Sequence, residues 1–282
     1  MRVTSLGLAT DVALRVLEGA EVSDRGGYLV VRSPDNPDFW WGNFLILPGP
    51  PEPGSASAWL ARFAAEFPTA QHVALAVDAA YPDATGSGGA GSGGPGHAVP
   101  VPAAISVPAD FPAAGLEPER GIVLTAASVT PPPRPAEHAG IRPLESDADW
   151  QASFDLAVRC FGAEGSQEYL VRRNAARRRL IRAGRGVWFG AFGGGRLLAQ
   201  LGVCDAGEGR VRYQDVETDP GARRRGLAGT LVWHAGLYAR RVLGAATLVI
   251  VADPAGEAIR VYRSCGFADA ETVLTFERPP AE

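Results

Sequence analysis

The sequence contains no lysine, because all 27 basic residues among its 282 are arginine. This absence excludes chemistry that needs a lysine amine, such as Schiff-base formation, attachment of pyridoxal phosphate or the phosphate loop of the Walker type. Alanine, glycine and proline are abundant as well. We attribute the preference for arginine to the codon usage of a GC-rich genome.

Cysteine, histidine and long apolar runs are also scarce. The cysteines Cys160, Cys204 and Cys265 lie far apart with no C-x-x-C pair, and the four histidines are scattered. This pattern predicts reduced thiols and no metal site. The sequence contains no run of about 18 apolar residues, which is the length that a helix needs to span a bilayer. The N-terminus also lacks the apolar core of a secretory signal. We therefore expect a cytoplasmic protein with no membrane association.

The length of the chain is sufficient for two domains of about 140 residues each. The net charge of −4 is unevenly distributed, since residues 1–138 carry −7 and residues 139–282 carry +3. An anionic ligand is therefore expected in the second half.

Two segments have the composition of linkers. Residues 83–102 are rich in Gly and Ser and are predicted to be a disordered insert, because they cannot bury enough apolar surface to offset the entropy of ordering. Residues 128–138 contain three consecutive prolines and are predicted to be an extended spacer. We place the boundary at this spacer, between a lobe of residues 1–127 and a lobe of residues 139–282.

The two halves resemble each other. Residues 111–125 and 262–275 both run from an aromatic residue through a turn at glycine into a strand. Upstream, the order of strand, helix and strand also agrees, with residues 44–48, 59–67 and 73–77 corresponding to 211–220, 226–241 and 247–251. We interpret this agreement as a duplication.

The halves differ in the loop that follows the first of these strands. In the first half, residues 48–54 contain four prolines, which remove backbone donors and stiffen the chain. In the second half, residues 219–229 read DPGARRRGLAG and lead into a helical pattern. Only the second loop can offer consecutive N–H groups to an anion.

The loop of residues 219–229 has the properties of a pyrophosphate cradle. The first N–H groups of a helix have no intrahelical partner, and the helix dipole favours negative charge there. Gly226 lets a bulky ligand approach the backbone, and Ala228 places only a small side chain at the next position of the pattern. Arg223, Arg224 and Arg225 supply positive charge in place of a lysine.

The R-x-x-G-x-A pattern at Arg223, Gly226 and Ala228 resembles the acetyl-CoA loop of the GCN5-related N-acetyltransferases (GNAT). Residues 258–267, AIRVYRSCGF, are similar to a second motif of that family, and residues 141–149 are similar to its first strand and turn. The resemblance covers residues 139–278, and the first half resembles the family as a degenerate copy. The whole chain looks like a tandem GNAT protein.

The resemblance implies an α/β fold of two tandem lobes, each a mixed and mostly antiparallel twisted sheet flanked by helices and splayed between its fourth and fifth strands. Acetyl-CoA would lie in that gap. The backbone of residues 216–218 would pair with the pantetheine arm, and the N–H groups of residues 224–229 would hold the pyrophosphate. The cofactor-binding residues would then be Val216, Glu217, Thr218, Arg223, Arg224, Arg225, Gly226, Leu227, Ala228 and Gly229.

Tyr262 would lie beside the sulfur of the donor and protonate the departing thiolate. A hydroxyl with an ordinary pKa near 10 can donate to a thiolate of similar basicity. The alternative is a helix aromatic that only packs on the sheet. Many family members have Asn seven residues earlier, where this chain has Ala255, so that contact is lost or passes to Asp253.

An amine must lose a proton before it attacks a thioester, so we expect a carboxylate base on the strand that faces the gap. Asp215 and Glu217 are the candidates. Alternation along a strand would place both on one face together with Tyr213. For each carboxylate, a solvated position or a pair with arginine is an equally good interpretation.

Two further features are interpreted as structural. The segment 172–185 contains seven arginines, and we expect a solvated helix face that pairs with the acidic first half rather than a nucleic-acid surface. Trp40 and Trp41 are expected to fill a core or an interface, although they could close one wall of an acceptor pocket.

The sequence thus predicts an acetyl-CoA-dependent N-acetyltransferase that acts on a primary amine of a small molecule or peptide, as a monomer or homodimer, without metal or nucleic acid. The alternative is a non-catalytic module that binds acyl-CoA and regulates a partner.

Overall fold

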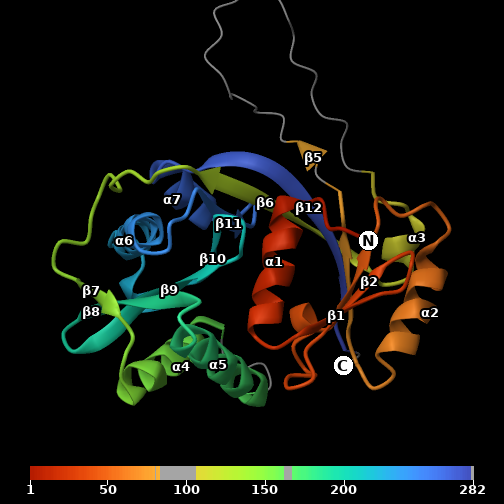
Figure 1. Ribbon diagram of the computed structural model, residues 1–282, viewed down its shortest axis with the longest axis horizontal. Coiled ribbons are helices and arrows are strands. Elements are labelled where there is room, and N and C mark those ends of the chain that lie inside the picture. Colours follow the sequence, from red (N-terminus) through yellow and green to blue (C-terminus); the bar gives the residue numbers. More distant parts are fainter. Residues whose placement is uncertain (80, 83–105, 162–166, 281–282) are drawn as a thin grey trace, which may run out of the picture.

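The computed structural model describes residues 1–79, 81–82, 106–161 and 167–280 (Figure 1). The predicted disordered insert at residues 83–102 lies outside these ranges. In the described part of the chain, none of the helices combines the length and the apolar character that a membrane span requires.

Twelve strands in the described residues form one sheet that runs through both halves of the sequence. The pairs β3–β4 and β10–β11 are parallel, and the other pairs are antiparallel. The expected mixed and mostly antiparallel sheet is therefore confirmed. In sheet order the strands are β1 (Glu21–Asp24), β2 (Leu29–Arg32), β3 (Phe44–Leu47), β4 (Val73–Val77), β12 (Ala268–Arg278), β6 (Glu117–Ala126), β11 (Thr247–Ala252), β10 (Arg210–Thr218), β9 (Arg196–Asp205), β8 (Gly186–Gly193) and β7 (Gly140–Pro143), and β5 (Tyr81–Pro82) pairs with β12.

The two halves exchange their last strands at the centre of the sheet. Strand β6 ends the first half but pairs with β11, with Leu124 opposite Ile250. Strand β12 ends the second half but pairs with β4, with Phe276 opposite Leu75. The two exchanged strands also pair with each other along most of their length, from Thr125 opposite Ala268 to Glu117 opposite Glu277.

The exchange delivers apolar side chains from each half into the core of the other. Leu124 is fully buried in the core of the second half, beside Ile250. Leu274 and Phe276 are fully buried in the core of the first half, where the ring of Phe276 lies 4.5 Å from that of Phe111. A fully buried Leu or Phe contributes about 2 kcal/mol, so each half depends on a strand of the other.

Helices cover both faces of the sheet (Figure 1). In the second half, α6 and α7 pack on one face, and α4 and α5 pack on the opposite face. In the first half, α2 and α3 lie on one face and α1 on the other. The helices are α1 (Leu6–Leu17), α2 (Ala56–Glu66), α3 (Asp110–Ala113), α4 (Asp147–Phe161), α5 (Gln167–Arg182), α6 (Leu227–Arg241) and α7 (Ala258–Ser264), with short 3-10 turns at Trp40–Gly42 and Pro220–Ala222.

Helix α1 lies across the boundary between the halves, where two buried carboxylates hold its start. Glu271 of β12 accepts hydrogen bonds from the Ser5 hydroxyl (2.6 Å) and the Gly7 N–H (2.7 Å). Asp78, directly after β4, accepts from the N–H groups of Thr4 and Ser5. Negative charge at a helix N-terminus is stabilising, so both carboxylates fix α1 against the exchanged strands.

The exchange predicts that neither half folds alone. In a fragment of residues 139–282, β11 would lose its partner β6, and β12 would lose its partners β4, β5 and β6. We expect this fragment and a fragment of residues 1–138 to lack cooperative unfolding when each is expressed separately. Mixing or coexpressing them should restore a two-state urea transition, measured by tryptophan fluorescence. Cooperative unfolding of either isolated fragment would contradict the prediction.

Candidate functional site

The site begins where the parallel strands β10 and β11 separate. They pair only from Arg210 opposite Thr247 to Arg212 opposite Val249. Beyond that point β10 continues along β9 to Thr218, whereas β11 continues along β6 to Ala252. The predicted splay between the fourth and fifth strands of this lobe is therefore confirmed.

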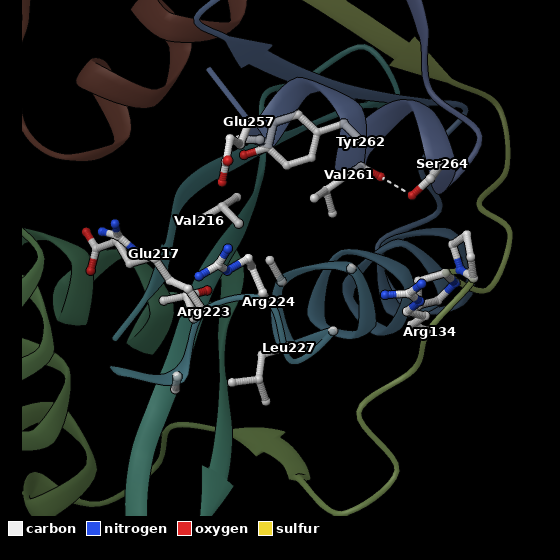
Figure 2. Close-up of a pocket in the computed structure, with 18 of the residues that line it drawn as sticks. Arg134, Val216, Glu217, Arg223, Arg224, Leu227, Glu257, Val261, Tyr262 and Ser264 are labelled. Carbon is white, nitrogen blue, oxygen red and sulfur yellow. Dashed lines mark hydrogen bonds between the residues drawn. The ribbon is translucent and has the colours of Figure 1, made fainter. Parts of the chain in front are cut away.

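A cavity of about 690 Å³ is lined by the end of β10, the start of α6 and helix α7 (Figure 2). It brings together residues that are far apart in the sequence, from Pro132 to Ser264. Most of the predicted site residues line it, namely Val216, Glu217, Thr218, Arg223, Arg224, Gly226, Leu227, Ala228, Gly229 and Tyr262.

Three predicted site residues do not line this cavity. Arg225 lines a separate hollow of about 220 Å³ with Pro135 and His138. Asp253 closes a turn, because its Oδ1 accepts a hydrogen bond from the Ala255 N–H (2.8 Å). Asp215 points to helix α5, as described below.

The start of α6 presents backbone donors to the cavity. The first intrahelical bond is donated by the Thr230 N–H to the Gly226 carbonyl (3.0 Å), so the N–H groups of Leu227, Ala228 and Gly229 precede it. Arg224 (φ 59°) and Gly226 (φ 78°) both adopt left-handed conformations, which curl the loop before the helix begins. An anion in this end of the cavity would meet unpaired N–H groups and the positive end of the helix dipole.

The corresponding helix of the first half already has an anion at its start. The Asp110 carboxylate accepts a hydrogen bond from the Ala56 N–H at the first turn of α2 (2.9 Å). This bond and one from the Gly54 N–H lower the pKa of Asp110. The first half therefore uses a carboxylate of its own where the second half leaves N–H groups facing a cavity.

Glu217 is a buried carboxylate that lines the cavity. It is 94% buried, and its Oε2 accepts a hydrogen bond from Gln200 Nε2 (2.6 Å). Gln200 Nε2 also donates to the Ser153 carbonyl on α4 (3.2 Å). Among the described residues, Oε1 of Glu217 has no hydrogen-bond partner. Burial, and then the nearby charge of Asp215, raise the pKa of Glu217 to about 7, so this side chain can accept a proton near neutral pH.

A β-bulge in β10 determines which side chains share its face. The pairing register with β9 shifts between Gln214 and Glu217, and Asp215 has a φ of 48°. Tyr213 consequently points to the opposite face, where its hydroxyl donates to the Val232 carbonyl of α6 (3.0 Å). The expectation that Tyr213 shares a face with Asp215 and Glu217 is wrong, because strict alternation does not persist through a bulge.

Asp215 is held by two buried arginines of α5. Arg173 donates to its Oδ1 (2.9 Å), and Arg177 donates to its Oδ2. Burial opposes the charged form of Asp215, but the two guanidinium charges outweigh it and lower its pKa. Asp215 therefore remains ionised and paired rather than available as a base.

The expectation of a fully solvated arginine face on α5 is wrong for Arg173 and Arg177. Their side chains are 12% and 5% exposed, since they neutralise Asp215 under the bulge. Other arginines of the segment do lie outside, and Arg179 pairs with Asp35 of the first half (3.5 Å). The segment therefore combines a structural ion network with an exposed face.

Tyr262 also lines the cavity, from helix α7. It is 5% exposed, and burial raises the pKa of its hydroxyl, which keeps the proton in place. Cys160, from α4, lines the cavity as well, and its Sγ donates to the Thr218 carbonyl (3.5 Å). Burial raises the pKa of this thiol to about 11, so it is neutral.

Sequence reasoning missed several residues of the site. Gln200 and Cys160 carry no local signal, because only strand pairing and helix packing place them beside Glu217 and Thr218. The proline-rich linker gave a signal, but it was interpreted as a spacer. In the structure Pro132, Pro133 and Arg134 line the cavity.

Trp40 and Trp41 line a second cavity, of about 970 Å³, in the first half. The ring of Trp40 stacks on His72, and Tyr169 of α5 contributes to the same wall. Both tryptophans are partly exposed, so core filling describes them incompletely. This cavity shares no lining residue with the first, and Trp40 and Trp41 therefore do not line the wall of the 690 Å³ cavity.

Comparisons with known proteins place this site in a family. Residues 150–267 match the model of the acetyltransferase (GNAT) family. No curated protein sequence matched the chain.

Solved structures share the fold over nearly the whole chain. A GCN5-related N-acetyltransferase from Kribbella flavida is 15% identical, with a TM-score of 0.59 over 98% of both chains. One from Sphaerobacter thermophilus is 19% identical, with a TM-score of 0.56 over 95% of this chain and 85% of its own. A functionally unknown protein from Staphylococcus epidermidis is 9% identical, with a TM-score of 0.61 over 93% of this chain and 95% of its own. The family model therefore identifies an acetyltransferase (GNAT) domain at residues 150–267, and the solved structures share the fold of the chain.

Proposed function

We propose that the chain is an acetyl-CoA-dependent N-acetyltransferase that transfers an acetyl group directly to a primary amine. The observation that carries the proposal is one cavity with three chemical functions on its wall. The start of α6 offers unpaired N–H groups, Glu217 offers a base near neutral pH, and Tyr262 offers a protonated hydroxyl. We assign the reaction to residues 139–282 and treat residues 1–127 as a degenerate copy that donates β6.

The lining of the cavity suits acetyl-CoA. The N–H groups of residues 227–229, with Arg223 and Arg224, would hold the pyrophosphate, and the backbone of residues 216–218 would face the pantetheine arm. When bound, acetyl-CoA supplies the thioester whose acetyl group is transferred. Arg225 and Asp253 lie outside the cavity, so we do not assign them to this binding.

Glu217 and Tyr262 divide the proton transfers between them. Glu217 accepts a proton from the ammonium form of the acceptor, through Oε1 or one water, and leaves a nucleophilic amine. As the new N–C bond forms and the C–S bond breaks, Tyr262 donates its proton to the sulfur. Gln200 holds Oε2 of Glu217, whereas Oε1 has no hydrogen-bond partner among the described residues and is left to accept the proton.

The acceptor that fits this proposal is a small-molecule or peptide amine in the cytoplasm. A broad panel of primary amines, with release of the CoA thiol as the readout, would test the reaction. Transfer to at least one amine is expected. Tight CoA binding without release for any amine would instead support the acyl-CoA-binding regulatory module.

The first kinetic prediction concerns pH. Because only the ionised form of Glu217 accepts a proton, and its folded pKa is about 7, kcat should fall about tenfold per pH unit below 7 and level off above it. Glu217→Gln should lower kcat about 10²- to 10⁴-fold and remove this dependence. Steady-state rates between pH 5 and 9 measure both effects.

Glu257 provides the comparison, since it is an exposed carboxylate that lines the same cavity. Glu257→Gln should retain the pH dependence of the unmodified protein. Loss of that dependence in Glu257→Gln, with retention in Glu217→Gln, would make the assignment of the base wrong.

The second kinetic prediction concerns Tyr262. Tyr262→Phe keeps the buried ring and removes only the proton donor, so kcat should fall about a hundredfold with little change in KM. A thermal melt checks that the fold is retained. Unchanged turnover would overturn the assignment of Tyr262 as the acid.

A further inference from the structure

The proline-rich linker, residues 128–138, is packed along helices α6 and α7 rather than extended away from them. At one end the Thr130 N–H donates to the Cys265 carbonyl, directly after α7 (3.0 Å). At the other end the Ala136 N–H donates to the Thr230 hydroxyl on α6 (2.9 Å). Between these two bonds Pro132 is buried. The linker is therefore held at both ends across the start of α6.

Two glycines of the loop are required by this packing. A Cβ on Gly226 would lie 2.1 Å from the Arg134 carbonyl oxygen, and a Cβ on Gly229 would lie 2.9 Å from Cβ of Pro132. Both distances are too short for any side chain. The close approach predicted at Gly226 is therefore made by the backbone of the linker. The linker can occupy this position because residues 226 and 229 of the loop are glycines.

This packing brings a third arginine to the cavity. Arg134 lines it together with Arg223 and Arg224, and all three side chains are exposed. Figure 2 shows Arg134 on the linker beside α6, whereas Glu217 and Arg223 come from the other side of the cavity. Pro132 and Pro133 add an apolar wall next to Val261 of α7.

The order of groups in CoA matches this arrangement. If Glu217 and Tyr262 flank the thioester and the α6 N–H groups hold the pyrophosphate, the adenosine and its 3′-phosphate extend toward the linker. A guanidinium binds a phosphate through charge-assisted hydrogen bonds. Prolines present flat apolar surface without N–H groups and suit the face of a base.

We infer that the interlobe linker forms the nucleotide end of the donor site, with Arg134 binding the 3′-phosphate of CoA and Pro132 and Pro133 contacting the adenosine. This inference rests on the proposed function. It gives the linker a role in selecting the donor, in addition to connecting the two halves.

Calorimetric titration with CoA and with dephospho-CoA, which lacks only the 3′-phosphate, tests the inference. The unmodified full-length protein should bind CoA about tenfold more tightly than dephospho-CoA. Arg134→Gln should weaken CoA binding about tenfold and leave dephospho-CoA binding unchanged, so that the ratio of the two dissociation constants approaches one. Arg134→Lys, which keeps the charge, should retain part of the preference.

Arg241→Gln is the matched control, because Arg241 is an exposed arginine at the opposite end of α6. It should preserve both affinities. Equal affinities of the unmodified protein for the two ligands, or an Arg134→Gln effect that is absent or equal for both, would overturn the inference. If the unmodified protein binds neither ligand, the proposed function itself fails, and this outcome is distinct from the others.

Discussion

The pairing of β6 with β12 at the centre of the sheet is the interaction on which the rest of the structure depends. Each strand comes from one half of the chain and completes the core of the other, so the two halves share one continuous sheet. The pairing also leaves β11 bound to β6 while β10 follows β9, and the end of β10 beyond this separation lines the cavity. The first half therefore supports the candidate active site through its own last strand.

The two halves also differ in what faces the first N–H groups of α2 and of α6, the helices that occupy corresponding places in the order of elements. In the first half the chain supplies Asp110 to the first turn of α2, and four prolines occupy the preceding loop. In the second half the loop contains arginines, and the first N–H groups of α6 face a cavity. The same electrostatic preference for negative charge at a helix N-terminus is thus met by a carboxylate of the chain in the first half, whereas in the second half the N–H groups face the cavity.

Buried charges beneath the bulge of β10 separate the roles of two neighbouring carboxylates. Asp215 is neutralised by Arg173 and Arg177. Within the described residues, the side chain of Glu217 has only Gln200 as a hydrogen-bond partner, and the negative charge of Asp215 raises its pKa. Two acids only two positions apart consequently have pKa values shifted in opposite directions. The arginine-rich segment, which looks like a simple charged surface in the sequence, provides the countercharge that makes this difference possible.

The sequence by itself determined the features that depend on local spacing. The strand, loop and helix around residues 219–229 follow from periodicity, because neighbouring residues alone define them. The motif that contains Tyr262 and the mixed sheet follow from the resemblance to the GNAT family. Only the tertiary structure decided the strand exchange, the face on which Tyr213 lies, the partners of Asp215 and Glu217, and the packing of the linker on Gly226 and Gly229. These features depend on pairing between distant segments and on one inserted residue in β10, and neither has a signature in the local pattern of side chains.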